Sequence, residues 1–454
     1  MLTAQDRAKM MLEQPVQRII PRLAFPAIIS MLITAIYNMA DTYFVSQIST
    51  SASGAVGVTF SAMAMVQAVA FMMAMGAGNN ISQHLGRGEM DKAQEYAACS
   101  FFATFAMGLA IMVLGNLNLD FVVRFLGATE TIAPYAKDYA RYIFFAAPFM
   151  MCSFTLNNFL RSSGLSSYAV IGITAGGVLN IVLDPIFIFV MDMGIAGAAI
   201  ATAVSQLVSF SILLVISNTR TDAITVTIRA FRFNGTTFYK IFSTGFPSLA
   251  RQGIASISTI VLNKMAGPYG DAAIAAMSIV MRYVMFLNSA VIGFGQGFQP
   301  VCGFSYGAGK YKRVKEALFF SMKVTTCILL TLAIVSAIFS GHIIALFRKE
   351  DAEVIRIGTL ALRMHLSTMP LWGAIIMSNM MTQTIGYSVE ATITAIARQG
   401  VFLIPALLIL PHFLDLTGVM IAQPIADICT LFLCIFVARR VLKDLDRKDT
   451  EENH

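Results

Sequence analysis

The chain has 454 residues, of which 57% are hydrophobic and only 13% are charged, with a formal net charge of +7. A soluble domain carries roughly 25% charged residues, so this chain cannot cover a folded surface with well-hydrated side chains, and a lipid bilayer is the solvent that suits it. The positive charge does not indicate a nucleic-acid partner, because the lysines and arginines lie mostly in short connections between apolar runs.

Twelve apolar segments have the length, about 20 residues or more, that a helix needs to cross a bilayer. In the first half they cover residues 17–45, 54–84, 93–117, 133–158, 167–190 and 195–217. In the second half they cover residues 238–265, 272–303, 314–340, 354–381, 389–411 and 416–440. Residues 1–18 are polar and charged, so we expect no cleavable signal peptide before the first span.

The two halves repeat one another at an offset of 221 or 222 residues. The matched pairs are Phe25-Pro26 with Phe246-Pro247, Gly86-Arg87-Gly88 with Gly307-Ala308-Gly309, Pro148 with Pro370, and Asn157 with Asn379. A two-fold repeat in an apolar chain is a common plan for secondary transporters, in which the substrate path lies between the halves.

The repeat predicts an all-α polytopic membrane protein of about 12 transmembrane helices in two pseudo-symmetric six-helix lobes. The expected parts are an N-lobe (1–217), a cytoplasmic linker (218–237), a C-lobe (238–441) and a cytoplasmic tail (442–454). We expect the six cysteines to be reduced packing residues, because they show no CxxC spacing and lie in or beside apolar segments.

The distribution of lysine and arginine predicts the orientation of the chain. With both termini in the cytoplasm, 21 of the 32 basic residues fall on the inner side, including Arg220 and Arg398, and six on the outer side, including Arg348 and Lys349. Cytoplasmic loops carry an excess of lysine and arginine. We therefore expect a multi-pass protein of the plasma (inner) membrane with both termini inside and the two lobes in the same orientation.

Two acids lie well inside the spans of the first half, Asp41 and Asp184, although a charge at a helix centre costs at least about 2.5–3.5 kcal/mol. Each has a polar neighbour one helical turn away, Tyr37 for Asp41 and Asn180 for Asp184. Further polar residues that could complete the cluster are Thr202, Asn157 and Tyr139.

These side chains suit a coupling ion. Desolvation penalises the charged form of a carboxyl group, so an acid inside the bilayer can bind a proton and release it when the cavity opens to water. Carboxylate, amide and hydroxyl oxygens at Asp41, Asp184, Asn180 and Thr202 would equally suit Na⁺, a hard cation. The sequence leaves H⁺ and Na⁺ open, and we expect no other cofactor.

The second half lacks these acids, because the positions equivalent to Asp41 and Asp184 are Leu262 and Ala406. Asp427 is its one acid deep in a span, and the sequence assigns no role to it. The sequence likewise assigns no partner to the intramembrane residues Arg251, Arg282 and Arg363. Methionines and polar residues that could line a substrate cavity are Met63, Met281, Met285, Gln252 and Asn288.

Several of these segments resemble the multidrug and toxic compound extrusion (MATE) family. The motifs are Ile36-Tyr37-Asn-Met-Ala-Asp41, Gly86-Arg-Gly, Arg161-Ser-Ser-Gly-Leu-Ser-Ser-Tyr, and Asn180-Ile-Val-Leu-Asp184-Pro185-Ile-Phe-Ile-Phe189. The resemblance covers essentially the whole chain and is greatest to the prokaryotic branch related to DinF and MepA. It implies two six-helix lobes and export of organic cations and other amphipathic compounds in exchange for Na⁺ or H⁺.

In that branch the N-lobe cation site matches Asp41, Asn180, Asp184 and Thr202, with Tyr37, Tyr139 and Asn157 nearby, and Pro26 matches a proline at which the first helix bends. Some members use acids in spans seven and ten for a C-lobe site. Here those spans hold no interior acid, so we expect coupling to depend on the N-lobe.

We therefore predict a monomeric antiporter for small amphipathic molecules, in contact with membrane lipids, and not an enzyme. The alternatives are a flippase for a lipid-linked precursor, an exporter of one specific metabolite, a channel, and a membrane-embedded enzyme. The five histidines are scattered, without an HExxH or HxxxH pair, which disfavours the enzyme. No filter-like repeated loop favours the channel.

Overall fold

The computed structural model describes residues 4–219, 224–232, 234–347 and 351–452. Arg220, Arg348 and Lys349, three of the charges that we used to predict orientation, lie outside this range. The first half comprises α1 (Ala4–Glu13), α2 (Val16–Ser46), α3 (Thr50–Gly86), α4 (Met90–Leu117), α5 (Leu119–Phe125), α6 (Ala133–Ser162), α7 (Ser166–Pro185), η1 (Ile186–Val190) and α8 (Gly194–Thr219).

The second half follows the short helix η2 (Ile228–Ala230). It comprises α9 (Gly235–Ala266), η3 (Gly267–Tyr269), α10 (Asp271–Gly307), α11 (Tyr311–Ile338), α12 (Ser340–Phe347), α13 (Ala352–Thr368), η4 (Met369–Leu371), α14 (Trp372–Thr384), α15 (Ser388–Ile396), η5 (Ala397–Phe402), α16 (Leu403–Ile409) and α17 (Pro411–Glu452). Every apolar segment predicted from the sequence is helical, and the prediction of an all-α membrane fold is confirmed.

Ten of these helices are long and apolar enough to cross a membrane among the described residues. The other two predicted spans differ from them. One is α9, which carries polar residues such as Arg251 and Gln252 along its length. The other is broken into α13, η4 and α14, because Pro370 at the start of η4 cannot donate a backbone hydrogen bond.

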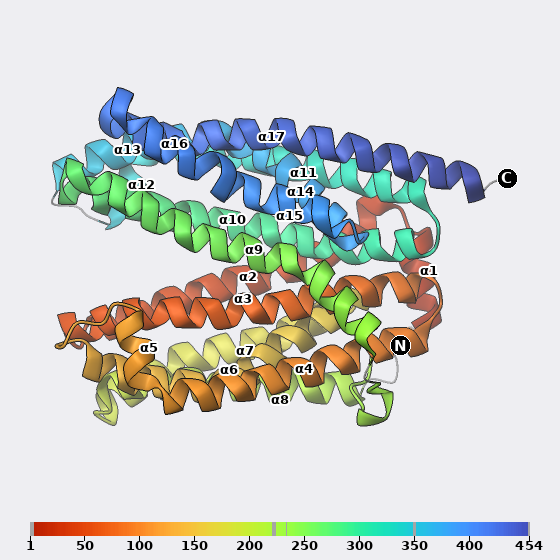
Figure 1. The fold of residues 1–454 in the computed structure, drawn as a ribbon, viewed down its shortest axis with the longest axis horizontal. Helices are drawn as coiled ribbons and strands as arrows, with labels where there is room; N and C mark the ends of the chain where they lie inside the picture. The colour runs from red at the N-terminus through yellow and green to blue at the C-terminus, as the bar shows by residue number, and fades with distance from the viewer. Residues whose placement is uncertain (1–3, 220–223, 233, 348–350, 453–454) are drawn as a thin grey trace.

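The two halves form two layers of helices (Figure 1). Helices of the first half lie together below, those of the second half lie above, and both ends of the described chain are at the same end of the bundle, as an even number of spans requires. Large apolar side chains such as Leu117, Phe125 and Phe432 are exposed on the outside, where a bilayer would cover them. The start of the chain crosses from the first layer of helices to the second, since Met11, Val16 and Ile19 pack into the core of the second half.

The repeat found in the sequence is also a repeat of contacts. The Asn157 side chain donates to the Ala169 carbonyl at 2.8 Å, and its counterpart Asn379 donates to the Ala391 carbonyl at 2.7 Å. Both bonds join one helix to the next across a tight turn, so each asparagine stabilises the same connection in its own lobe.

Candidate cation-coupling site

The lobes meet through glycines near the end of the bundle that holds the termini. A Cβ atom on Gly76 would lie 2.0 Å from the Ile241 carbonyl oxygen, and one on Gly245 would lie 2.0 Å from the Met72 carbonyl oxygen. Helices α3 and α9 can therefore cross at this distance only because neither residue has a side chain. Gly297 of α10 packs on Ala24 of α2 in the equivalent crossing.

Polar bonds join the lobes at the same end. The Gln83 amide donates to the Thr384 carbonyl at 2.6 Å, Asn80 donates to the Thr244 hydroxyl at 3.3 Å, and Arg161 donates to the Gln296 side chain. The lobes are therefore closed against one another at the end of the bundle that carries the termini.

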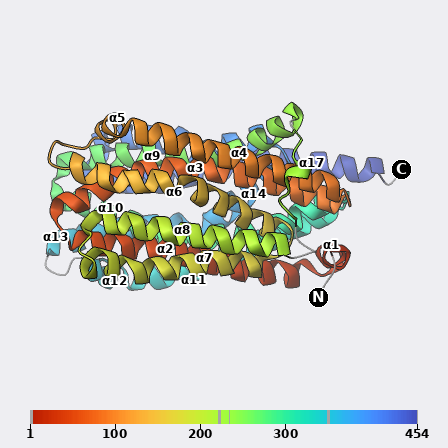
Figure 2. The ribbon, with the colours of Figure 1, turned by 90° about the horizontal axis from the view of Figure 1, so that it is seen from below.

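The two N-lobe acids lie away from this interface, on helices that pack together. Asp41 is on α2 and Asp184 is near the end of α7, and Figure 2 shows α2, α7 and α8 side by side. Asp184 is fully buried, whereas Asp41 is half-buried. Gly177 of α7 allows this packing, because a Cβ there would lie only 2.9 Å from Ile33 and 3.2 Å from Tyr37.

Five of the predicted residues bond within two small groups. The Tyr139 hydroxyl of α6 donates to Asp41 Oδ2 at 3.2 Å. The Asn180 amide lies 3.2 Å from Asp184 Oδ1 and 3.3 Å from the Thr202 hydroxyl of α8. Tyr139 also lies within electrostatic range of both Asp41 and Asp184, so the two groups form one polar region inside the N-lobe.

Several acceptor oxygens in this region lack donors. Among the described residues of this region, three buried carboxylate or amide oxygens have no hydrogen-bond partner: Asp41 Oδ1, Asn180 Oδ1 and Asp184 Oδ2. In the described part of the chain, neither acid is paired with a lysine, arginine or histidine, and Asn180 has its amide donor directed at oxygens. Unpaired buried acceptors are costly, and oxygens of this kind are the ligands that a proton or a hard cation would satisfy.

A small cavity adjoins these residues. Its volume is about 20 Å³, enough for roughly one water molecule. Its lining includes Tyr37, Gly176, Asn180, Thr202 and Gln206. Tyr37 therefore faces the same space as Asn180 and Thr202.

The remaining predicted residues lie elsewhere. Asn157 donates to the Ala169 carbonyl and does not bond to either acid. Pro26 lies inside α2, which stays helical from Val16 to Ser46, so the predicted bend does not interrupt the helix here. These two residues shape the N-lobe rather than the polar region itself.

The suggested cavity residues also separate. Met63 is buried in the N-lobe core, and Met281 packs against the C-lobe core. Met285 is exposed, Gln252 is half-buried, and Asn288 has a buried Oδ1 without a partner.

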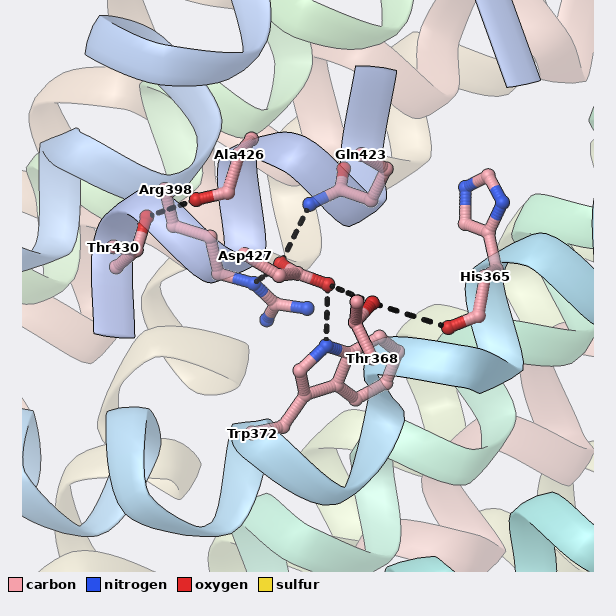
Figure 3. A network of polar contacts seen from close by, with 8 residues as sticks. All are labelled: His365, Thr368, Trp372, Arg398, Gln423, Ala426, Asp427 and Thr430. Atoms are coloured by element: carbon pink, nitrogen blue, oxygen red, sulfur yellow. Dashed lines mark hydrogen bonds and ion pairs between the residues drawn. The ribbon is translucent and has the colours of Figure 1, made fainter. Parts of the chain in front are cut away.

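The C-lobe contains a polar network that the sequence did not predict (Figure 3). Asp427 Oδ1 accepts from Arg398 Nε at 2.8 Å and from Gln423 at 3.0 Å, while Oδ2 accepts from Trp372 Nε1 at 2.7 Å and from Thr368 at 3.0 Å. The placement of Arg398 among the cytoplasmic charges is therefore wrong. It lies in η5, within the span, and an arginine there needs an acid partner.

The other unassigned arginines have neutral partners or are exposed. Arg251 donates to Asn379 Oδ1 at 3.2 Å, and Arg363 donates to the Ser340 hydroxyl at 2.9 Å. Arg282 is exposed on α10.

Two helical lobes that close at one end, with unpaired acids buried inside one lobe, define a multi-pass membrane transporter. The MatE family model matches residues 26–186 and 247–409. The multidrug export protein MepA of Staphylococcus aureus is 29% identical over 446 residues, which are 97% of each chain, and that of Staphylococcus saprophyticus is 28% identical over 414 residues, 91% of each chain. The chain belongs to the MatE family.

Solved structures of the family have the same fold. An outward-facing multidrug resistance MATE transporter of the MOP superfamily superposes with a TM-score of 0.92 at 26% identity, covering 96% of this chain and 98% of that one. A MATE structure described as bent superposes with a TM-score of 0.91 at 25% identity, covering 98% and 99%. A MOP superfamily transporter from Pyrococcus furiosus, described as having a binding pocket of reversed polarity, superposes with a TM-score of 0.91 at 26% identity, covering 96% of this chain and 98% of that one.

Proposed function

We propose that this transporter is a multidrug efflux antiporter, which exports small amphipathic and cationic compounds in exchange for H⁺ or Na⁺ bound in the N-lobe. The observation that carries the proposal is the set of three unpartnered oxygens on Asp41, Asn180 and Asp184. The similarity to multidrug export proteins along almost the whole chain supports the substrate class.

The charge of the N-lobe region explains why an ion would couple to transport. With both carboxylates ionised, two negative charges lie in a buried region without a basic partner among the described residues. Asp41 and Asp184 would hold the ion, Asn180 and Thr202 would complete its oxygen ligands, and Tyr139 would fix the orientation of Asp41 by its hydrogen bond. An ion bound more tightly in one conformation than in the other shifts the equilibrium between them by that difference in affinity.

The lobe contacts indicate which conformation this is. If both termini are cytoplasmic, as the distribution of lysine and arginine predicts, the closed glycine interface lies on the cytoplasmic side and the substrate path opens outward. The likeness to an outward-facing transporter of the same fold supports this assignment. Opening to the cytoplasm would then require the crossings at Gly76–Gly245 and Ala24–Gly297 to separate.

The test is uptake of a fluorescent cationic dye into everted membrane vesicles, with Na⁺ and pH gradients imposed separately. We compare the wild type with Asp184→Asn and with Asp192→Asn as a matched control. Asp192 is exposed just beyond η1 and has a φ of 53°, a conformation that asparagine also adopts readily.

We expect the wild type and Asp192→Asn to move dye under one gradient, which identifies the coupling ion, and Asp184→Asn to move none at an equal amount of protein in the membrane. Export by Asp184→Asn at the wild-type rate would refute the N-lobe coupling site. If neither gradient drives dye into wild-type vesicles, multidrug export itself is refuted, and a lipid precursor or a single metabolite becomes the substrate to test.

A further inference from the structure

The Asp427 network is the most complete set of polar contacts inside the C-lobe. Asp427 is fully buried, and each of its oxygens accepts two hydrogen bonds, from Arg398 and Gln423 on one side and from Trp372 and Thr368 on the other. The Arg398 guanidinium also lies 4.3 Å from the centre of the Trp372 ring, within range of a cation–π interaction. This acid therefore has what the N-lobe acids lack, a full set of donors and a positive partner.

By the internal repeat, this network is the C-lobe equivalent of the N-lobe cavity. The bonds Asn157–Ala169 and Asn379–Ala391 fix the offset between α7 and α15–η5 at 222 residues. Gly197 of α8 lies against Phe187 and Gly418 of α17 lies against Leu410, and the two glycines set the offset between α8 and α17 at 221. Phe187 and Leu410 are 223 apart, so the offset rises from 222 before η5 to 223 after it, and we apply 222 to Arg398, the second residue of η5. With these offsets the counterparts of Arg398, Gln423 and Asp427 are, in that order, Gly176, Thr202 and Gln206.

All three N-lobe counterparts line the small cavity beside Asn180. At the position of Arg398 the N-lobe has Gly176, which leaves space, whereas the C-lobe has a guanidinium group. At the position of Asp427 the N-lobe has the neutral Gln206, and its acids are displaced onto α2 and the end of α7. The two lobes therefore differ at equivalent positions. The N-lobe has a cavity near two acids without a basic partner among the described residues, whereas the C-lobe has the guanidinium group of Arg398 bound to Asp427.

Arg398 projects toward α17 from a segment with an unusual backbone, η5. The helix widens to a π-helix over Ala397–Phe402, which frees backbone groups from their usual partners. The Ser258 hydroxyl of α9 donates to the Gln399 carbonyl at 2.5 Å, so a neighbouring helix satisfies one of these groups. The next residue, Gly400, packs against Ile254 of the same helix. The widened turn is therefore held in place by α9, one of the helices that form the lobe interface.

We propose that Arg398 is a tethered cation, which permanently fills the C-lobe counterpart of the N-lobe ion cavity, so that the C-lobe binds no free coupling ion. Removing the guanidinium group should convert the Asp427 pocket into a binding site for a small cation. The Arg398 side chain is 14% exposed, so the surrounding helices do not completely enclose the space that it occupies. The proposal relies on the proposed function only for the comparison with the N-lobe cavity.

The test uses the full chain with its N-lobe acids neutralised by Asp41→Asn and Asp184→Asn, so that cation effects report on the C-lobe alone. Into this background we place Arg398→Ala and measure thermal unfolding in detergent with guanidinium chloride, NaCl or N-methylglucamine chloride at equal ionic strength. Urea, the neutral analogue of guanidinium at the same low concentration, controls for effects of the compound on the unfolded chain.

We expect guanidinium to raise the melting temperature of Arg398→Ala by about 2–4 °C relative to urea, because a ligand that binds only the folded state stabilises it. The response should vanish when Asp427→Asn is added. Arg363→Ala, which removes an exposed C-lobe arginine bonded only to a hydroxyl, should show no such response. An Arg398→Ala variant that responds to guanidinium no more than Arg363→Ala does would overturn the proposal.

A second measurement needs no change at Arg398. Binding of radioactive Na⁺ to the purified Asp41→Asn/Asp184→Asn chain should be undetectable, because Arg398 already occupies the C-lobe pocket. Stoichiometric Na⁺ binding that disappears with Asp427→Asn would show that the pocket takes a free cation beside Arg398, and the proposal would be wrong. Neither measurement depends on whether the N-lobe acids couple to export, so the two proposals fail separately.

Discussion

Adding one methyl group at the lobe interface should disable the transporter. Gly245 lies where α9 crosses α3, and a Cβ there would be 2.0 Å from the Met72 carbonyl oxygen. The Gly245→Ala variant therefore cannot keep this crossing. Gly253→Ala is the matched control, because it lies on the same helix with nothing within 4 Å of its Cβ position.

The size of the effect follows from the geometry. Contacts below 3.0 Å are essentially never made by real Cβ atoms, so the crossing must open by about 1 Å. Forcing a methyl group into a well-packed site costs about 1–3 kcal/mol. The gain in helix propensity from glycine to alanine, about 1 kcal/mol, is common to both variants and cancels in the comparison. The closed interface should then become about 5- to 150-fold less favourable in Gly245→Ala than in the control.

Two assays measure this change. Dye uptake into everted vesicles should fall about tenfold or more in Gly245→Ala, within the range set by that energy, and remain near the wild-type rate in Gly253→Ala. Backbone amide exchange over residues 241–249 should be faster in Gly245→Ala, because the facing helix no longer covers this segment. Equal dye uptake and equal exchange in the two variants would refute the claim that glycine contact closes the lobes.

Three further outcomes can be measured on the purified protein. Asn157→Ala and Asn379→Ala should each lower the free energy of unfolding by about 1–3 kcal/mol, because a buried carbonyl loses its donor, and similar melting temperatures for these variants and the exposed Asn118→Ala would contradict this. A lipid-soluble maleimide should label Cys327, which is exposed, before the buried Cys99, Cys152 and Cys302, as followed by mass spectrometry, and early labelling of the buried three would be inconsistent with the packing. Arg356→Gln should lower stability by less than about 1 kcal/mol, because its ion pair with Glu353 is exposed on both sides and screened by salt, whereas a larger loss in thermal unfolding would point to a further contact of α13.

The apolar segments and the spacing of residues along the chain predicted much of the helical architecture. Apolar length alone located the ten helices that are long and apolar enough to cross a membrane among the described residues, because a backbone in lipid must satisfy its hydrogen bonds within the helix. The spacing of four residues also placed Asn180 beside Asp184 correctly, since residues one turn apart share a face of any helix. These are local consequences of the chain and need no knowledge of its neighbours.

Segment length and residue spacing could not predict the hydrogen-bond partner of Asn157 or the ion-pair partner of Asp427. Asn157 was expected near the acids, yet its amide satisfies a carbonyl twelve residues ahead, across a turn. Asp427 and Arg398 are 29 residues apart, on α17 and on the π-helix η5, and packing between these helices brings them together. Residue spacing along the sequence predicts neighbours only within one regular helix, so it could not predict that Arg398 pairs with Asp427 on another helix.

The sequence by itself determined the solvent of this protein, its all-helical class and its two-fold repeat, because these depend on composition and on distances along the chain. Only the tertiary structure decided which acids are paired and which are not. Asp427 has four donors and Asp184 has one, although both are buried aspartates in apolar helices. The reason is that the energy of a buried charge depends on groups brought to it by other helices, and their arrival depends on packing between elements far apart in the chain.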